Sequence, residues 1–145
     1  MNVDRILALA ERVEGATGSD REIDLAISVA INFKDAFVSE ERQGEWRWGF
    51  GSDEIERRRP DGVRSGYLDP AQFVPRWTAS LDAAMLLVPE GCRFYVDNGT
   101  LDDGASHACA YQQRPQKFSG GCKGAATPAL ALTASCLRAI AAGEG

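Results

Sequence analysis

The sequence predicts an α+β fold: a single domain over residues 1–145, built as an α/β/α-layered sandwich around an antiparallel sheet of about four strands. Three observations lead to this prediction. Four stretches carry apolar residues at the three- and four-residue spacing of amphipathic helices, and four shorter stretches alternate as strands do. Their order, α-α-β-β-α-β-β-α, groups the strands into two hairpins, whose apolar side needs helices to bury it. A content of 44% hydrophobic and 26% charged residues is ordinary for a globular chain.

The first two helices are predicted from their apolar stripes and from the residues that begin or end them. The first covers residues 3–13 and ends at Gly15. Ser19 and Glu22 have the spacing of a capping box, in which the serine oxygen accepts from a first-turn amide and the glutamate accepts from the serine amide. We therefore expect a second helix whose apolar stripe covers residues 23–31.

The middle of the chain changes to a two-residue period. Aromatic residues alternate with arginine and glycine over residues 46–50, which predicts a strand with one aromatic face. Residues 52–62 are polar and end in a Pro-Asp-Gly turn signal, and residues 63–67 alternate again, as expected for a partner strand. Thr78 or Ser80 then begins a third helix.

The last third of the chain predicts a second hairpin and a closing helix. Residues 92–96 and 106–111 alternate as two strands, and the Gly-rich residues 113–124 indicate a mobile linker. Thr127 followed by Pro128 marks a helix start, because the threonine oxygen accepts from an unpaired amide and proline needs no donor at the first helical position. Small residues cover nearly all sides of this helix, which predicts deep burial.

Three short segments carry a family resemblance. They are S-D-R-E-I-D within residues 18–30, T-A-S-L-D-A-A within residues 75–91 and A-T-P-A-L-A-L within residues 125–138. With these segments in this order the chain resembles the phage ABA sandwich domain proteins, which are small proteins of phages and prophages. The resemblance implies an α/β/α-layered fold and a phage origin, and it brings no reaction and no catalytic residues.

Composition narrows the classes of partner and the location. The net charge of −5 disfavours the phosphate backbone of nucleic acids as a partner. No apolar run approaches the roughly 20 residues that cross a bilayer, and the first residues lack the pattern of a secretory signal. We therefore expect no membrane contact and a location in the cytoplasm of the bacterial host.

Metal binding and catalysis depend on the single histidine and the cysteines. His107 with Cys92, Cys109 and Cys122 could supply four zinc ligands, but the CxxC spacing of zinc sites is missing. A cysteine with His107 could also form a catalytic pair, oriented by Asp97, Asp102 or Asp103, but a nucleophile motif is missing. We therefore expect no metal, no cofactor and no enzymatic activity. A small Cys/His-dependent enzyme is the third functional hypothesis.

The first hypothesis is protein binding. Trp46 and Trp48 lie near the consecutive Arg57, Arg58 and Arg59, and mixtures of aromatic residues and arginine are typical of interface hot spots. Aromatic residues alternating on a strand also pack under helices as core, so this strand has two interpretations. With the resemblance, these residues suggest a phage-encoded accessory protein that binds and inhibits a host factor, for example a component of bacterial anti-phage defence.

The second hypothesis is a sponge that sequesters an anionic nucleotide signal. Lys117 and Lys123 flank a glycine-rich stretch, and Thr127 begins a helix whose positive end can receive a phosphate. The consecutive Arg57, Arg58 and Arg59 could clamp the same anion. The same residues are also consistent with a solvated linker. A homodimer is a further expectation, through an exposed sheet edge or through the small-residue helix of residues 125–142.

Overall fold

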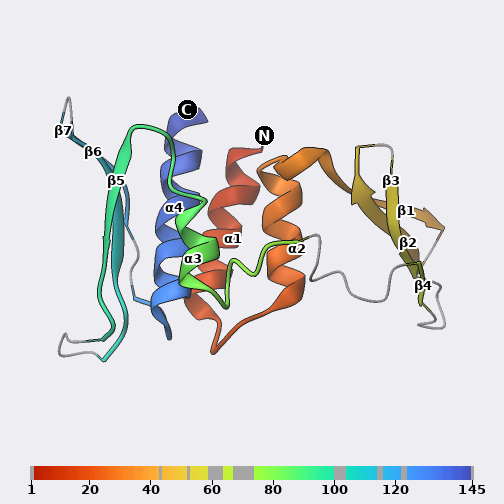
Figure 1. Cartoon of the computed structure of the whole chain (residues 1–145), viewed down its shortest axis with the longest axis horizontal. Coiled ribbons are helices and arrows are strands. Elements are labelled where there is room, and N and C mark those ends of the chain that lie inside the picture. The colour runs from red at the N-terminus through yellow and green to blue at the C-terminus, as the bar shows by residue number, and fades with distance from the viewer. Residues whose placement is uncertain are drawn as a thin grey trace.

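A computed structural model of the chain describes residues 2–42, 44–51, 53–58, 64–66, 74–99, 104–113, 116–121 and 124–144. In this part of the chain, four α-helices occupy the middle of an elongated molecule and one antiparallel sheet lies at each end (Figure 1). The α+β class and the antiparallel strands are thereby confirmed. The strands form two sheets instead of one and the helices lie between them, so the α/β/α layering is not confirmed.

The first two helices are α1 (Val3–Gly15) and α2 (Arg21–Ala30). The predicted capping box at Ser19 and Glu22 is wrong, because Asp20 is the residue that caps α2. Its Oδ1 accepts hydrogen bonds from the amides of Glu22 at 2.9 Å and Ile23 at 3.2 Å. A charged carboxylate at this position also interacts favourably with the positive end of the helix.

A 3₁₀ turn, Phe33–Asp35, leads from α2 into a four-stranded sheet that follows the chain order: β1 (Ala36–Arg42), β2 (Glu45–Phe50), β3 (Asp53–Arg58) and β4 (Arg64–Gly66). The aromatic strand β2 was predicted, but β1 and β3 were not, and they are its direct partners. The predicted partner near residues 63–67 corresponds to β4, which pairs with β3. The predicted Pro-Asp-Gly turn lies outside the described residues.

The third helix, α3 (Leu81–Met85), is short and begins at Ser80, whose hydroxyl accepts from the Ala83 amide at 3.2 Å. Of the two predicted start residues, Ser80 is therefore the N-cap. Leu81 and Met85 are exposed while Ala84 is buried, so only one side of α3 packs on the rest of the chain.

The second sheet contains β5 (Cys92–Val96), β6 (Ala108–Gln113) and β7 (Gln116–Gly121) in that order. The expectation of a mobile linker over residues 113–124 is wrong, because β7 lies within it. Its glycines serve packing: a Cβ on Gly120 would lie 2.4 Å from the Ser135 carbonyl oxygen and 2.5 Å from the Ala139 amide nitrogen. The strand can approach the last helix this closely only because Gly120 lacks a side chain.

That last helix, α4 (Pro128–Glu144), is the centre of the main hydrophobic core. Thr127 caps it as predicted, accepting from the Leu130 amide at 3.2 Å. Residues 129–137 are all buried, against α1, α3 and the second sheet. The predicted deep burial of this helix is confirmed, and the chain itself covers residues 129–137. Among the described residues, no helix is long and apolar enough to cross a membrane.

Candidate functional site

The aromatic strand β2 contributes most of its rings to the inside of the molecule. Trp48 is 1% exposed and packs with Val74 in a small second core, with Trp46 and Phe50 partly buried beside it. The rings of Trp48 and Phe50 meet edge to face at 5.9 Å between centroids. Trp48 is therefore a core residue, and the expectation that it contacts a partner is corrected.

The other face of the same sheet carries a different pair of side chains. The guanidinium carbon of Arg47 lies 5.1 Å from the centre of the Phe37 ring, which is a cation–π contact between β2 and β1. Arg57 is the register partner of Arg47 on β3, so both arginines belong to this face. Sequence analysis missed Phe37, because its contact with Arg47 exists only through the β1–β2 pairing.

Of the three consecutive arginines, Arg57 is the one whose side chain the structure describes. Arg57 pairs with Glu45 and Glu54, with N···O distances of 3.0 Å in both ion pairs. Arg58 is the register partner of Trp46 on β2, and Arg59 lies outside the described residues.

The residues expected to bind an anion are separated where the structure describes them. Lys117 is the second residue of β7 and lies opposite Gln112 of β6, whereas Thr127 follows the end of β7 in the chain. Gly121 lies four residues further along β7 than Lys117, a length of about 13 Å at 3.3 Å per residue. Lys123 lies outside the described residues.

The cysteines and the histidine show no activated pair within the described ranges. Burial, with a smaller contribution from nearby Cys92, raises the pKa of Cys136 to about 12, and burial also raises the pKa of Cys109. A raised pKa disfavours the reactive thiolate. His107 Nδ1 lies 3.8 Å from Asp97 Oδ2. No group of three or more metal-ligating side chains is found among the described residues, which do not include Cys122.

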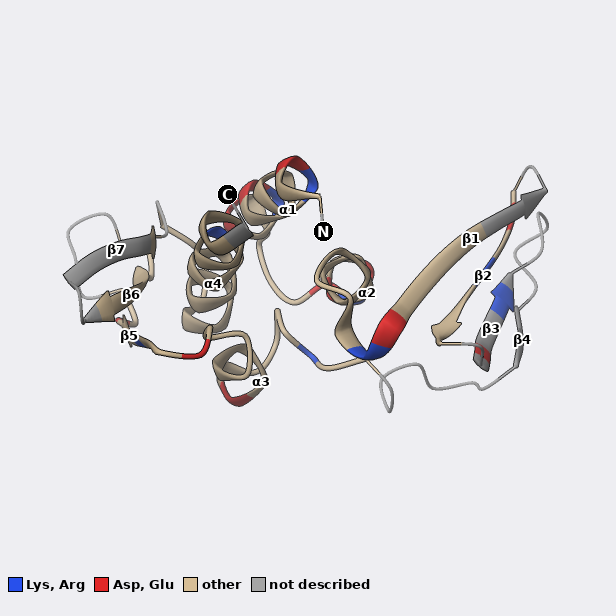
Figure 2. Ribbon diagram, turned by 90° about the horizontal axis from the view of Figure 1, so that it is seen from above, with Lys and Arg blue, Asp and Glu red and all other residues tan. Residues whose placement is uncertain are grey.

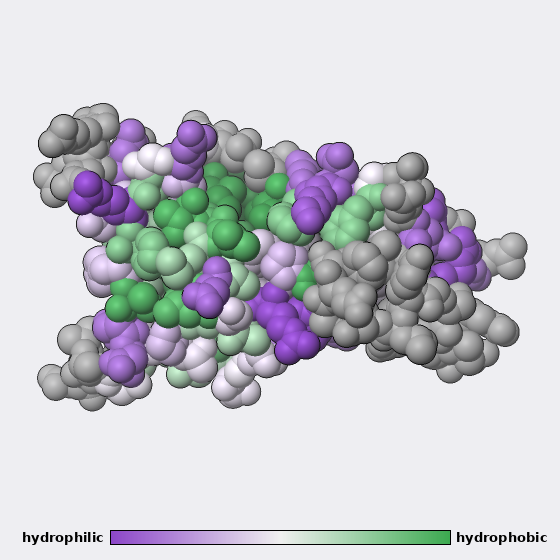
Figure 3. All heavy atoms as spheres, viewed as in Figure 1, coloured by the Kyte–Doolittle hydropathy of each residue, from purple (hydrophilic) through white to green (hydrophobic). Residues whose placement is uncertain are grey.

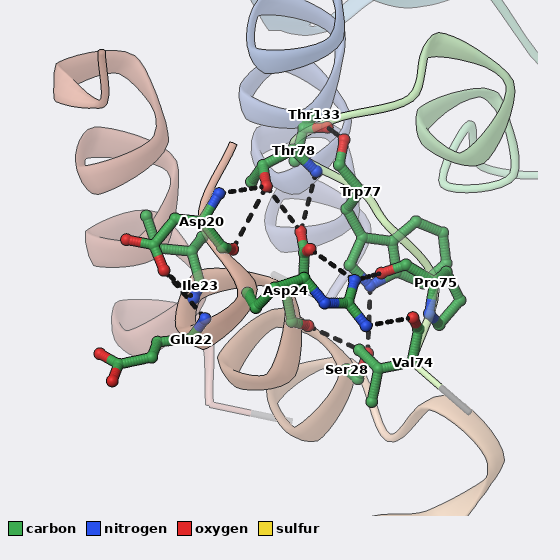
Figure 4. Close-up of polar contacts among 11 residues, drawn as sticks. Asp20, Glu22, Ile23, Asp24, Ser28, Val74, Pro75, Trp77, Thr78 and Thr133 are labelled. Carbon is green, nitrogen blue, oxygen red and sulfur yellow. Dashed lines mark hydrogen bonds and ion pairs between the residues drawn. The ribbon is translucent and has the colours of Figure 1, made fainter. Parts of the chain in front are cut away.

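A buried polar network between α2 and residues 74–78 was not foreseen from the sequence (Figure 4). Its centre is the Asp24 carboxylate, which is fully buried. Thr78 donates to Asp24 Oδ1 from its amide and from its hydroxyl, each at 2.8 Å, and Arg21 donates to Oδ2 at 2.8 Å. Burial raises the pKa of Asp24, and the hydrogen bonds from Thr78 and the charge of Arg21 oppose this rise.

The network extends to the neighbouring backbone. Arg21 donates from its other terminal nitrogen to the Val74 carbonyl at 2.8 Å, and the Asp20 amide donates to the Thr78 hydroxyl at 2.9 Å. Residues 74–78, which have no regular secondary structure, are thereby fixed to the start of α2.

The same network reaches α4 through Trp77. The indole nitrogen of Trp77 donates to the Ser28 hydroxyl at 3.1 Å, and the Thr133 hydroxyl donates to the Trp77 carbonyl at 2.8 Å. Asp24, Thr78 and Thr133 come from the three segments that carry the phage-family resemblance, so these segments meet at one place in the fold. Because the network's donors and acceptors bond to one another, its role is to hold the helices together.

A second ion pair, between α1 and α4, supports the other side of the helical layer. Arg138 pairs with both carboxylate oxygens of Glu14, at 2.5 and 2.6 Å, and donates to the Gly121 carbonyl of β7 at 2.8 Å. Both side chains are largely buried. This bidentate pair links two helices and the end of a strand, which is a structural task.

We compared the chain with protein-family models, curated proteins and solved structures, and none matches it. The resemblance to the phage ABA sandwich proteins therefore stays a prediction made from the three segments.

Proposed function

We propose that this protein acts by binding another protein through the outward face of its four-stranded sheet. The single observation that carries the proposal is the contact of Arg47 with Phe37 on this face, with Arg57 next to it in register. Among the residues that the structure describes, no helix lies beyond this sheet, at the end of the molecule away from α2 (Figures 1 and 2). Arginine beside an aromatic ring is a frequent anchor in protein interfaces.

The chemistry of the face favours a protein partner. Two arginines with Glu45 and Glu54 give it both signs of charge, and the side chains of Arg57 and Glu54 are 36% and 38% exposed. Exposed ion pairs add little to folding stability, so they can exchange partners at low energetic cost.

The resemblance supplies the class of partner. A small phage protein without catalytic residues acts on its host by occupying a host component, and we propose a bacterial host protein, such as a defence factor, as the target. The class of partner is proposed by analogy with phage proteins, whereas the binding face is proposed from the contacts of Arg47 and Arg57.

Affinity capture from bacterial lysate tests the proposal. We expect the wild type to retain a host protein, and the variant Arg47→Glu, with Phe37→Ser as a second variant, to retain at least about tenfold less of it. Arg12→Glu is the matched control, because Arg12 is an exposed arginine of α1, far along the chain from this sheet. Circular dichroism establishes that each variant is folded. Equal capture by Arg47→Glu and by the wild type, or no captured protein at all, would overturn the proposal.

A further inference from the structure

We propose that β5 is a self-association edge: two copies of this chain pair their β5 strands antiparallel, around Phe94, and join their three-stranded sheets into one six-stranded sheet. This inference concerns the opposite end of the molecule from the proposed partner face and does not depend on it. Three observations support it: which backbone groups of β5 point to the free edge, which side chains β5 exposes, and where α3 lies.

In the β5–β6 ladder, hydrogen-bonded residue pairs alternate with non-hydrogen-bonded pairs, and this alternation determines which backbone groups of β5 point to the free edge. The Asp97 amide donates to the His107 carbonyl at 2.9 Å, in register with the ladder. Because bonded and non-bonded pairs alternate in antiparallel ladders, Tyr95 and Arg93 also bond toward β6. The amide and carbonyl groups of Phe94 and Val96 therefore point to the free edge, where the described strands provide no partner.

Of the four edge strands in the described sheets, β5 has the fewest features that protect an edge from pairing, with the charged Arg93 as one of them. The edge strand β1 has a register shift between Glu40 and Arg42, and the pairing of the edge strand β7 with β6 is also interrupted by a register shift. The edge strand β4 is only three residues long. β5 has five residues in unbroken register, with neither proline nor lysine. Bulges, prolines, lysines and short length are the features by which edges avoid pairing, so β5 is the edge best suited to it.

The outward side chains of β5 in one molecule complement those of β5 in a second copy. In an antiparallel pair centred on Phe94, Arg93 lies directly opposite Tyr95 of the second copy, and the symmetry repeats this pair. Both residues are exposed, Tyr95 to 58%. Directly opposite residues of a non-hydrogen-bonded pair have the closest side chains, and arginine over a tyrosine ring is a favourable contact. No charge is left opposite a like charge, which favours a second copy as the occupant.

The backbone offers four hydrogen bonds in this register. Phe94 of each copy donates to Phe94 of the other, and Val96 of each copy donates to the Cys92 carbonyl of the other. The Cys92 amide already donates to the Pro89 carbonyl at 3.0 Å and takes no part.

The β5 strand of a second copy would also have apolar side chains of α3 to pack against on its inner face. α3 projects beyond β5 on one side of the molecule (Figure 2). The helix and its C-cap residue carry three exposed apolar side chains: Leu81, Met85 and Leu86, the last 74% exposed. Hydrophobic side chains gather on this face of the molecule (Figure 3). A second copy at the edge would remove part of this surface from water.

The test measures the mass of the full chain and its variants by light scattering and sedimentation. We expect the wild type to reach twice the monomer mass of 15.7 kDa with rising concentration. Tyr95→Arg sets two arginines opposite each other and should weaken association about tenfold, whereas Tyr95→Glu should retain it. The double variant Arg93→Glu with Tyr95→Arg restores opposite charges and should dimerise again. Arg47→Glu is the control on the other sheet and should leave the dimer unchanged.

Amide hydrogen exchange supplies a second readout that does not depend on a variant. The amides of Phe94 and Val96 should exchange more slowly as the concentration rises. A monomer at all concentrations, a dimer unaffected by Tyr95→Arg, or exchange at these two amides that is independent of concentration would each overturn the proposal. If β5 instead pairs with a strand of another protein, the chain alone would stay a monomer at all concentrations.

Discussion

Replacing Thr78 by valine tests whether the buried network stabilises the fold. Valine keeps the shape of threonine and removes only the hydroxyl. Asp24 then loses a hydrogen bond of 2.8 Å, and the Asp20 amide loses its acceptor at 2.9 Å. Loss of a hydrogen bond to a charged group costs about 1.5–3 kcal/mol and loss of a neutral one about 1 kcal/mol, so we expect about 3 kcal/mol less free energy of unfolding.

Thr78→Ser is the matched control, because it keeps the hydroxyl and removes only the methyl group. Thr78 is 1% exposed, and a buried methyl contributes about 1 kcal/mol. The assay is urea unfolding followed by tryptophan fluorescence, in which Trp77 reports on the network directly. At slopes of about 1–3 kcal/mol per molar urea, the valine variant should unfold at least about 1 M earlier than the wild type. If valine costs less than about 1 kcal/mol, or no more than serine, the hydroxyl does not stabilise Asp24 and the reasoning fails.

The cost of Thr78→Val should also depend on pH. Burial raises the folded-state pKa of Asp24 above its ordinary value of 3.8, so the folded chain holds this proton more tightly than the unfolded chain. The associated stability is present below pH 3.8 and is lost as the pH rises through the folded pKa. The Thr78 bonds lower that pKa, and removing one of them raises it further. The valine variant should therefore lose little in acid and most near neutral pH, as measured by the same urea titrations.

Three further predictions address the packing of α4. Gly120→Ala should destabilise the chain by at least about 1–3 kcal/mol, because its Cβ would overlap helix backbone, whereas Gly15→Ala, with open space around it, should be neutral or stabilising by thermal unfolding. Arg138→Met should cost about 3 kcal/mol by leaving the Glu14 carboxylate buried without its partner, and Arg138→Met with Glu14→Leu should recover most of this loss in the same measurement. Cys136 should resist alkylation in the native protein and react in urea, as followed by peptide mass spectrometry; native reactivity equal to that of a free thiol would contradict its burial.

The parts of the fold that the sequence predicted are those with strong local signals. The helix start at Thr127 and Pro128 needs only neighbouring residues, and the alternation in β2 and β5 directly reflects their two faces. β1, β3 and β7 were missed because their residues are charged or glycine-rich. Their strand conformation comes from pairing with a neighbouring strand, which no local window contains.

The candidate sites follow the same division. Trp48 and Arg47 are adjacent in sequence and lie on opposite faces of the sheet. Trp48 is a core residue and Arg47 lies on the outward face because the Trp48 face is the one that packs toward α2. Asp24 was indistinguishable from an exposed helix acid, since its partner Thr78 lies 54 residues away. Long-range hydrogen bonds of this kind leave no periodic signal in the sequence.

The two sheets are held to the helices in different ways, and this difference bears on what each can do. The second sheet packs on α4 at backbone distance through Gly120 and belongs to the main core. The first sheet joins the helices through the small cluster of Trp48 and Val74. Val74 is itself held by Arg21, which also binds Asp24, so the network that joins the three resemblance segments also anchors this sheet. A segment with a small core opens at lower free energy than the rest, which suits a surface that adapts to a partner. The tightly packed second sheet instead presents a fixed edge, and fixed geometry is what pairing with an identical strand requires.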